Sequence, residues 1–353
     1  MSDFSDVTTI KIDRQTLTRR LPPTKGVPST KPKPQPAPVH KGQLPDTDEL
    51  EHTIELDAKG LPLRHRELMP GEAFYSYTIT KLVKRGGEGT VYTAINQRGE
   101  KVVIKVAHPN RLSALVAEVI ERGRSAAEEM RTAILERLPG ALVLKHIDGL
   151  TLNDYFKLYP EHRSPSFILR LINHIDKKLR QHQRAHGDVS MDNIFLVTQA
   201  NGSLKVELID PGAAKWTRTS LRMGKEKITG SPLFMAPETA CGKLPTEKVD
   251  VYALGILLAM LLCQKKPFPK DQTPEGTKIE SYKDFAFNMR AQGKSFVPPL
   301  TKENFIQAVN DKQTLGEEVF NLFNLMTAQT PDWRIGLYDV TTSIEILLAT
   351  HDL

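Results

Sequence analysis

Alternating apolar and polar positions dominate the chain from residue 74 to about residue 107. The segments FYSYTITKLVKRGG and GTVYTAINQRGEKVVIKVAH are rich in Val, Ile, Thr and Tyr, a pattern that favours antiparallel strands, with a hairpin at QRGE. Residues 111–138 change to helical spacing and predict a helix in two pieces, broken near Gly123. A further strand is expected at 141–147.

The chain after residue 150 is mostly helical in pattern. Four segments show helical spacing: FILRLINHIDKKLRQHQRA, EKVDVYALGILLAMLL, EEVFNLFNLMTAQ and VTTSIEILLA. Only NIFLV and LKVELID interrupt them, as a small strand pair. A β-rich half followed by a helical half predicts an α+β fold with two lobes across a cleft. We expect an N-terminal region at 1–73, an N-lobe at 74–148 and a C-lobe at 149–353.

Composition separates the N-terminal region from the rest. The 353 residues are 39% hydrophobic and 25% charged, as in globular proteins, but residues 22–45 hold eight of the 24 prolines. That segment predicts an extended, largely disordered spacer, with a proline-recognising partner as the alternative. Residues 1–45 hold eight Lys or Arg against three Asp, so most of the net charge of +6 lies there. This favours a solvated arm, and we expect no nucleic-acid partner.

The sequence predicts no membrane span, no secretory signal and no cysteine framework. The longest apolar run, at 252–263, is shorter than the roughly 20 residues of a membrane span, so none is expected. The N-terminus lacks the apolar block of a secretory signal. Cys241 and Cys263 are too few for a disulfide framework and lack metal-ligand spacing. We therefore expect a reducing, cytoplasmic location.

Candidate chemistry begins at RAHGDVSMDNIFLV, residues 184–197, which places Asp188, Asp192 and Asn193 beside an apolar strand. Alone, such a segment is usually a turn capped by its own side chains. Asp210, in LIDPG, ends the second strand of the same pair. Phosphoryl transfer from a nucleotide needs a carboxylate for the attacking hydroxyl and oxygen ligands for magnesium. These side chains supply both.

A second group lies in the β-rich half. Gly86, Gly87 and Gly89 fall in a turn between two strands, where backbone N–H groups can approach phosphates closely. Lys105 stands among apolar neighbours in VVIKVA, sixteen residues after Gly89. A lysine there can snorkel at an edge, but after a glycine turn it is also well placed to meet phosphates.

From about residue 78 to 345 the sequence resembles the eukaryotic-type, or Hanks-type, protein kinases. The motifs that carry the resemblance are KRGGEGTV, VVIK, HGDVSMDN, DPG, GSPLFMAPE and DVYALG, in the order and spacing of that family. The resemblance implies a bilobal fold with a β-rich N-lobe and an α-helical C-lobe. It also implies transfer of the γ-phosphate of ATP, with Mg²⁺, to Ser or Thr of protein substrates. We further expect autophosphorylation at Thr217, Thr219, Ser220 or Thr229, which lie close together in a basic segment.

The resemblance also assigns roles. Lys105 would hold the α and β phosphates, and Asp188 would act as catalytic base or orient the acceptor hydroxyl. Asn193 and Asp210 would bind magnesium. The residues implied to cover the nucleotide are Gly86, Gly87, Gly89 and Val91. Leu144 matches the gatekeeper position, and the backbone near Lys145 and Ile147 would meet the adenine. Glu238 would pair with Arg334, a structural role shared by Asp250.

Several positions depart from the family pattern. Lys84 replaces the first glycine of the loop, and Ser190 stands where many protein kinases keep a lysine. Pro211 replaces the phenylalanine of the metal-binding triplet. Gly187 replaces the arginine before the catalytic aspartate, which is the usual partner of a phosphorylated activation loop. We therefore expect any activity not to depend on that phosphorylation in the usual way.

The helix glutamate that pairs with Lys105 is open among three residues, Glu118, Glu128 and Glu129. We expect Glu128 to be the partner of Lys105, because it shares a helix face with Arg131 and Leu135.

Two other readings stay open beside a protein kinase. HGD and DPG also resemble aminoglycoside and choline phosphotransferases, which act on small molecules; GSPLFMAPE and Ser231 favour a protein Ser/Thr substrate instead. An inactive pseudokinase scaffold is the other alternative. The short stretch at 138–141, where a further strand is usual, favours a trimmed bacterial, phage or effector-type kinase.

Overall fold

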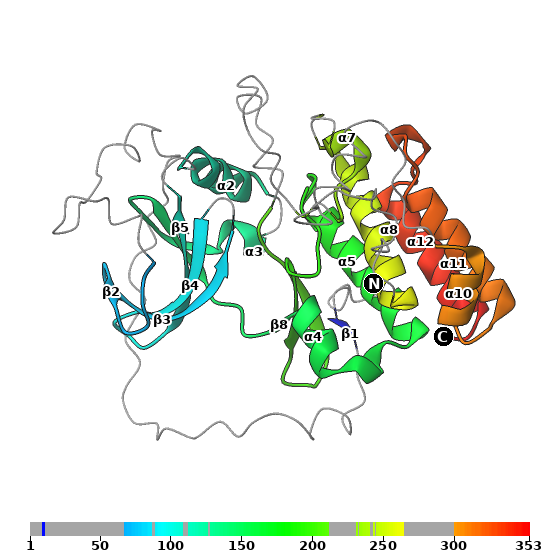
Figure 1. Ribbon diagram of the computed structural model, residues 1–353, viewed down its shortest axis with the longest axis horizontal. Coiled ribbons are helices and arrows are strands. Elements are labelled where there is room, and N and C mark those ends of the chain that lie inside the picture. The colour runs from blue at the N-terminus through cyan, green and yellow to red at the C-terminus, as the bar shows by residue number, and fades with distance from the viewer. Residues whose placement is uncertain are drawn as a thin grey trace, which may run out of the picture.

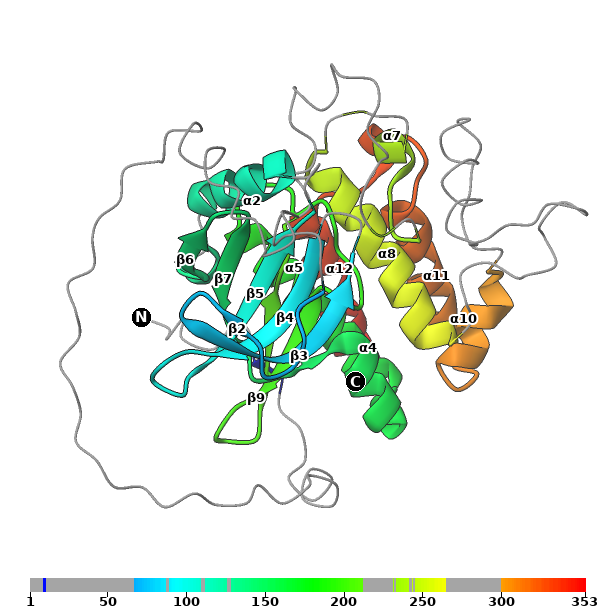
Figure 2. The same ribbon diagram turned by 60° about the vertical axis from the view of Figure 1, so that its left-hand side comes forward.

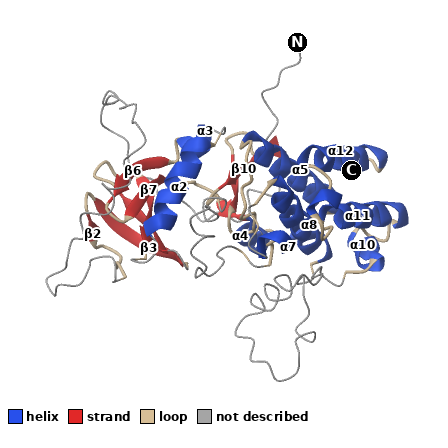
Figure 3. Cartoon of the chain, turned by 90° about the horizontal axis from the view of Figure 1, so that it is seen from above, coloured by secondary structure: helices blue, strands red, loops and turns tan. Residues whose placement is uncertain are grey.

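Strands gather at one end of the molecule and helices at the other, with a smaller sheet between them (Figures 1 and 3). The structure is a computed structural model, and it describes residues 9–10, 67–86, 89–108, 112–125, 128–211, 231, 233–240, 243, 245–264 and 300–353. This arrangement confirms the predicted α+β fold with a β-rich N-lobe and a helical C-lobe.

The N-lobe is built on a six-stranded antiparallel sheet in the order β2-β3-β4-β5-β7-β6. Its strands are β2 (Ala73–Phe74), β3 (Tyr77–Arg85), β4 (Gly89–Ile95), β5 (Lys101–Ala107), β6 (Ile134–Leu138) and β7 (Ala141–Lys145). The predicted hairpin joins β4 to β5. Its turn is closed by the Asn96 N–H, which donates to the Glu100 carbonyl at 3.0 Å, and Gly99 supplies a φ of 79°.

The period of two along β5 decides where Lys105 points. Ile104 and Val106 are buried in the core on one face of the sheet. Lys105 therefore lies on the opposite face, which helix α2 (Leu112–Arg124) covers. Leu115 of α2 belongs to the apolar cluster on that face, and α2 lies beside β5 and β7 in Figure 2.

The helix expected over 111–138 is shorter than predicted. After α2 the chain forms one short helix, α3 (Glu128–Arg131), and then strand β6, which pairs with β7. The apolar positions of ILERL fit both a helical spacing and the alternation of a strand. Pairing with β7 decides for a strand, and Leu135 stays exposed. The further strand is thus present, so the expectation of a trimmed lobe loses its basis.

The C-lobe is organised around one buried helix, α8 (Glu247–Cys263), which is apolar on all sides from Val251 to Ala259. The other described helices are α4 (Leu152–Leu158), α5 (Pro165–Gln181), α7 (Pro237–Ala240), α10 (Lys302–Ala308), α11 (Gln313–Met326) and α12 (Leu337–Thr350), with short 3₁₀ turns at Pro160–His162 and Pro331–Trp333. Four of them, α5, α10, α11 and α12, contact α8. The four long helices predicted from the pattern are confirmed.

The smaller sheet has the order β1-β10-β9-β8. It contains the predicted pair, β9 (Ile194–Thr198) and β10 (Leu204–Leu208), together with β8 (Leu150–Thr151). Its fourth strand, β1 (Thr9–Ile10), comes from the N-terminal region and pairs antiparallel with β10. The proline-rich segment 22–45 lies outside the described residues. The lobe boundary at 148/149 stays a prediction; β7 ends at Lys145 and β8 begins at Leu150.

Within the described ranges, none of the helices has both the length and the apolar character that crossing a membrane requires.

A buried carboxyl group joins α5 to α12. Asp176 is fully buried, and its Oδ2 accepts a hydrogen bond from the Thr341 hydroxyl and lies 3.3 Å from Arg180 Nε. Burial raises the pKa of Asp176 to about 7, even though Thr341 and Arg180 act to lower it.

Folding stability should therefore depend on pH through Asp176. Because its pKa in the folded state is about 7 against an ordinary 3.8, the folded chain holds a proton that the unfolded chain has released between these values. The free energy of unfolding falls as pH rises through this window, by up to roughly 1.4 kcal/mol per pH unit. We expect Asp176→Asn to reduce this fall, because the amide does not ionise.

Urea unfolding at pH 4.5, 6 and 8 measures this effect. The matched control is Asp339→Asn, an exposed carboxylate on the same helix pair. A pH profile for Asp176→Asn parallel to that of wild type would contradict the prediction.

Candidate active site

A buried carboxylate from α8 holds the loop that carries Asp188. Asp250 accepts the backbone N–H of His186 at 2.7 Å and that of Gly187 at 2.8 Å. Burial raises the pKa of Asp250 to about 7, while the two backbone donors act to lower it. The loop turns at Gly187, whose φ of 74° favours glycine. Asp250 thus has the structural position expected for it.

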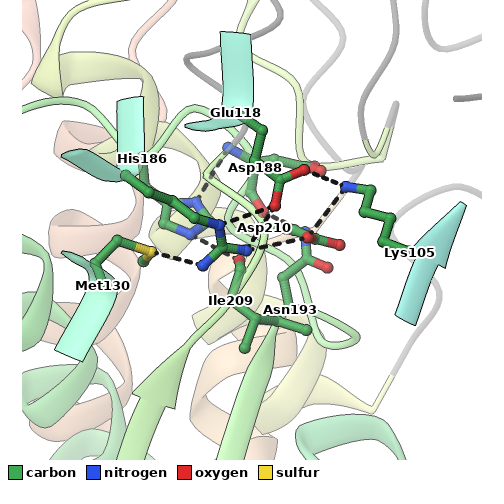
Figure 4. Close-up of polar contacts among 9 residues, drawn as sticks. Lys105, Glu118, Met130, His186, Asp188, Asn193, Ile209 and Asp210 are labelled. Carbon is green, nitrogen blue, oxygen red and sulfur yellow. Dashed lines mark hydrogen bonds and ion pairs between the residues drawn. The ribbon is translucent and has the colours of Figure 1, made fainter. Parts of the chain in front are cut away.

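The ring of His186 joins this loop to the segment that carries Asp210. Its Nε2 lies 2.9 Å from the Ile209 carbonyl (Figure 4). A carbonyl can only accept, so Nε2 carries the hydrogen and Nδ1 is left to accept from the Asp188 N–H, at 3.4 Å. The two acidic residues are therefore fixed relative to each other.

Asp188 and Asn193 face each other across the turn of the loop. Asn193 Nδ2 donates to the Asp188 carbonyl at 2.9 Å, which leaves the Oδ1 oxygen of the amide to serve as a ligand. Asp188 Oδ1 accepts the backbone N–H of Ser231 at 3.0 Å. The carboxylate thus lies next to the segment that follows the predicted activation loop.

Lys105 reaches from β5 to two carboxylates. Its Nζ lies 2.6 Å from Glu118 Oε2 on α2 and 3.3 Å from Asp210 Oδ1 (Figure 4). Burial alone would raise the pKa of Glu118, but Lys105 and Arg122 together hold it below its ordinary value. The sheet, α2 and the end of β10 therefore meet at one charged junction.

The choice of Glu128 as the partner of Lys105 is wrong. Glu128 lies on α3, beyond the end of α2, and its side chain is exposed. The choice assumed one helix face shared with Leu135, but residue 135 belongs to strand β6. Glu118 is the partner because α2 lies directly over the face of β5 that carries Lys105.

The residues implied for the nucleotide lie on that same face of the sheet. Val91 of β4 stands directly opposite Lys105, and Leu144 of β7 stands opposite Val103 of β5. Directly opposed residues share a face, so these side chains line the side that faces α2. Ile147 follows β7 and is half-buried. Their contact with adenine stays a prediction.

Two of the three predicted loop glycines are described, and they differ in their surroundings. The Gly86 N–H donates to the Gly89 carbonyl at 2.9 Å, and the Gly86 carbonyl lies 2.9 Å from His108 Nε2. A Cβ at Gly89 would stand 2.3 Å from the Val106 carbonyl oxygen, whereas one at Gly86 would meet nothing closer than 3.4 Å. Gly87 lies outside the described residues.

Lys84, which replaces the first loop glycine, reaches from the sheet to the Asp188 loop. Lys84 Nζ lies 3.8 Å from Asp192 Oδ2 in the Asp188 loop, and both side chains are more than half exposed. An exposed pair of this kind contributes little stability.

The oxygen ligands at the junction fit magnesium shared with a ligand's phosphates. Asn193 and Asp210 offer hard amide and carboxylate oxygens from the same end of the β9–β10 pair, where the Ile209 N–H donates to the Asn193 carbonyl at 3.0 Å. Across the described part of the chain, no cluster of three or more His, Cys, Asp or Glu could hold a metal alone. Mg²⁺ is commonly held by one or two protein groups with phosphates and waters, so the donor set fits it.

The predicted pair of Glu238 and Arg334 is confirmed. The Nη1 and Nη2 atoms of Arg334 donate to the two carboxylate oxygens at 2.5 and 2.7 Å, and both side chains are buried. Arg334 also donates to the carbonyls of Lys248, Ala328 and Gln329. This network fixes α7, close to the Asp188 loop.

A pocket opens beside Asp188. It lies between the Asp188 loop and the segment around α7, and its lining includes Gly187, Asp188, Ser231, Phe234 and Thr239.

Sequence reasoning missed two residues of the junction. His186 was part of a motif without a role of its own, and Arg122 was not considered. Arg122 lies four residues after Glu118 on α2. A charged pair at that spacing on an otherwise apolar helix face is the signal that could have found both Glu118 and Arg122.

Similarity to known proteins extends over most of the chain. Residues 77–343 match the family model described as "Protein kinase domain". CBL-interacting protein kinase 25 of Oryza sativa subsp. japonica is 29% identical over 217 residues, covering 55% of this chain and 41% of that protein. Serine/threonine-protein kinase Pkn1 of Myxococcus xanthus is 25% identical over 209 residues, covering 55% and 29%. The chain thus spans less than half the length of these curated relatives.

A solved structure shares the fold. The crystal structure of the Mycobacterium tuberculosis PknI kinase domain superposes with a TM-score of 0.51 at 17% sequence identity, covering 80% of this chain and all of that one. At this identity the likeness concerns the fold alone.

The two described loop glycines should respond differently to alanine. Gly89→Ala places a methyl group 2.3 Å from the Val106 carbonyl oxygen, so β4 and β5 must separate and the midpoint of thermal unfolding should fall by several degrees. Gly86→Ala meets only ordinary contacts and should unfold within about two degrees of wild type. Differential scanning calorimetry compares them; equal losses in both variants would contradict the argument.

Proposed function

The chain belongs to the protein kinase family, and we propose that it transfers the γ-phosphate of ATP, with Mg²⁺, to Ser or Thr hydroxyls of a protein substrate. The observation that carries this proposal is the meeting, at one junction between the lobes, of Lys105 from β5, of Asp188 and Asn193 from one loop, and of Asp210 from the end of β10. The names of the relatives support Ser/Thr specificity.

Each side chain has a task that its chemistry allows. Lys105 binds the phosphates as a point charge, supported by Glu118. Asp188 orients the acceptor hydroxyl and accepts its proton. Asn193 and Asp210 hold magnesium, which when bound neutralises charge on the phosphates. His186 and Asp250 hold these groups in fixed positions relative to one another.

Two further parts of the proposal, the cellular location and a protein partner, rest on the sequence alone. We also propose a cytoplasmic location, because two cysteines are too few for a disulfide framework. A protein that recognises proline-rich segments stays a prediction for residues 22–45.

Transfer of phosphate should depend on Asp188 and Lys105. With labelled ATP, Mg²⁺ and a generic basic protein, we expect Asp188→Asn and Lys105→Met to lose at least about 100-fold in rate, because each removes a group that acts on the reacting phosphate or hydroxyl. The control is Asp311→Asn, an exposed residue with a φ of 59° that asparagine tolerates well.

Three outcomes separate the candidate functions. The proposal is supported if wild type and Asp311→Asn form phosphoserine or phosphothreonine and the Asp188→Asn and Lys105→Met variants do not. Transfer to aminoglycosides or choline-like alcohols, with none to protein, would replace it with a small-molecule phosphotransferase. Nucleotide binding without any transfer would indicate a pseudokinase.

We also expect autophosphorylation within the segment between Asp210 and Glu238. This segment lies largely outside the described residues, and its candidate hydroxyls are those of Thr217, Thr219, Ser220 and Thr229. Because Gly187 provides no cation for a phosphorylated loop, replacing all four by alanine should leave transfer to a basic protein within about threefold of wild type.

Mass spectrometry after incubation with Mg-ATP tests the first part of this prediction, with Asp188→Asn as the control for contaminating kinases. Absence of phosphate on residues 217–231 of wild type would contradict it. A quadruple alanine variant that loses transfer would contradict the second part.

A further inference from the structure

A second cation is buried beside Lys105. Arg122 is 3% exposed, and its Nε and Nη2 atoms donate to Glu118 Oε1 at 2.9 and 2.7 Å. Its Nη2 also lies 3.6 Å from Asp210 Oδ1, and its Nη1 lies 3.1 Å from the sulfur of Met130 on α3. Arg122 therefore contacts the same two carboxylates as Lys105.

The four charged groups alternate in sign. Lys105 takes Oε2 of Glu118 while Arg122 takes Oε1, and both cations approach Oδ1 of Asp210. Two cations and two carboxylates balance, which a buried cluster requires. If Arg122 were neutral, Glu118 and Asp210 would share the single charge of Lys105.

The position of each cation decides which one can serve a ligand. Lys105 is on the sheet face that also carries Val91 and Leu144, the residues assigned to the nucleotide. Arg122 is instead enclosed by α2, α3 and the end of β10, so it stays with the carboxylates when Lys105 turns to phosphates.

We infer that Arg122 is a positioning residue for phosphate binding: by neutralising Glu118 and Asp210, it leaves the charge of Lys105 available to the phosphates of a nucleotide. The inference rests on the proposed function for the nature of the ligand. Without Arg122, the cluster carries a net negative charge that repels phosphates, and the two carboxylates hold Lys105 more tightly. Both effects weaken phosphate binding.

The test compares two ligands that differ only in phosphates. The affinities of wild type and Arg122→Met for ADP and for adenosine are measured by isothermal titration calorimetry with EDTA in place of Mg²⁺, so that no metal ion offsets the charge of Asp210. We expect Arg122→Met to lose about tenfold or more in ADP affinity, while adenosine affinity stays within about threefold. A merely structural role would lower both affinities alike, and that result would overturn the inference.

Further variants separate charge from packing. Arg122→Lys keeps the charge but loses one of the two hydrogen bonds to Glu118, so its ratio of ADP to adenosine affinity should lie between those of wild type and Arg122→Met. Met130→Leu removes only the sulfur contact on α3 and should keep the wild-type ratio. If Arg122→Met does not fold, a wild-type ratio in Arg122→Lys together with a reduced one in Met130→Leu would overturn the inference.

A charge-balanced double variant gives the sharpest readout. Glu118→Gln combined with Arg122→Met leaves Lys105 and Asp210 as one balanced pair, so the ADP preference should recover relative to Arg122→Met alone. Failure to recover, with the fold intact by circular dichroism, would overturn the inference. These binding measurements do not require transfer: a wild type that binds ADP but phosphorylates nothing would sink the proposed function and leave the role of Arg122 supported.

Discussion

Charge balance in a largely buried junction is the constraint on which the site depends. Removing a carboxylate from water costs several kcal/mol. Attraction to a nearby cation offsets this cost only when the geometry of the pair is good. Glu118 is buried on α2 and has cations on both of its oxygens, Lys105 from the sheet and Arg122 from its own helix. The position of α2 over the sheet is therefore set by charge as well as by the apolar cluster around Leu115.

The helical lobe satisfies a different requirement, that of holding a polar loop still. Backbone N–H groups in a loop have no partners of their own and need fixed acceptors. Asp250 supplies one from α8, the most deeply buried helix of the lobe, and its two hydrogen bonds reach the residues just before Asp188. His186 then carries this rigidity to the Asp210 segment through the Ile209 carbonyl. Asp188 and Asp210 are thus positioned from a core helix.

Much of the fold was predictable because its patterns are unambiguous. The alternation in β3 to β5 and the long helical spacings after residue 150 have one reading each, and the Glu238 and Arg334 pair lay in recognisable motifs. The stretch 128–138 was misread because ILERL fits both periods and only the β7 edge decides between them. That error propagated directly to the choice of Glu128. The spacing of Glu118 and Arg122 is a local signal, but no local pattern reports the contact of Arg122 with Asp210, 88 residues away.

One departure from the family pattern, Gly187 in place of an arginine, has a reason in the backbone of the Asp188 loop. An arginine before the catalytic aspartate would have to adopt the left-handed backbone that Gly187 holds at a φ of 74°, which costs a side chain about 1 kcal/mol. The loop gains its order instead from Asp250 and from the Ser231 N–H on Asp188. The additional positive charge lies on α2, as Arg122, where it acts on Glu118 and Asp210 without any modified residue. These contacts order the described part of the site without a phosphate group, which fits the expectation that activity does not depend on activation-loop phosphorylation in the usual way.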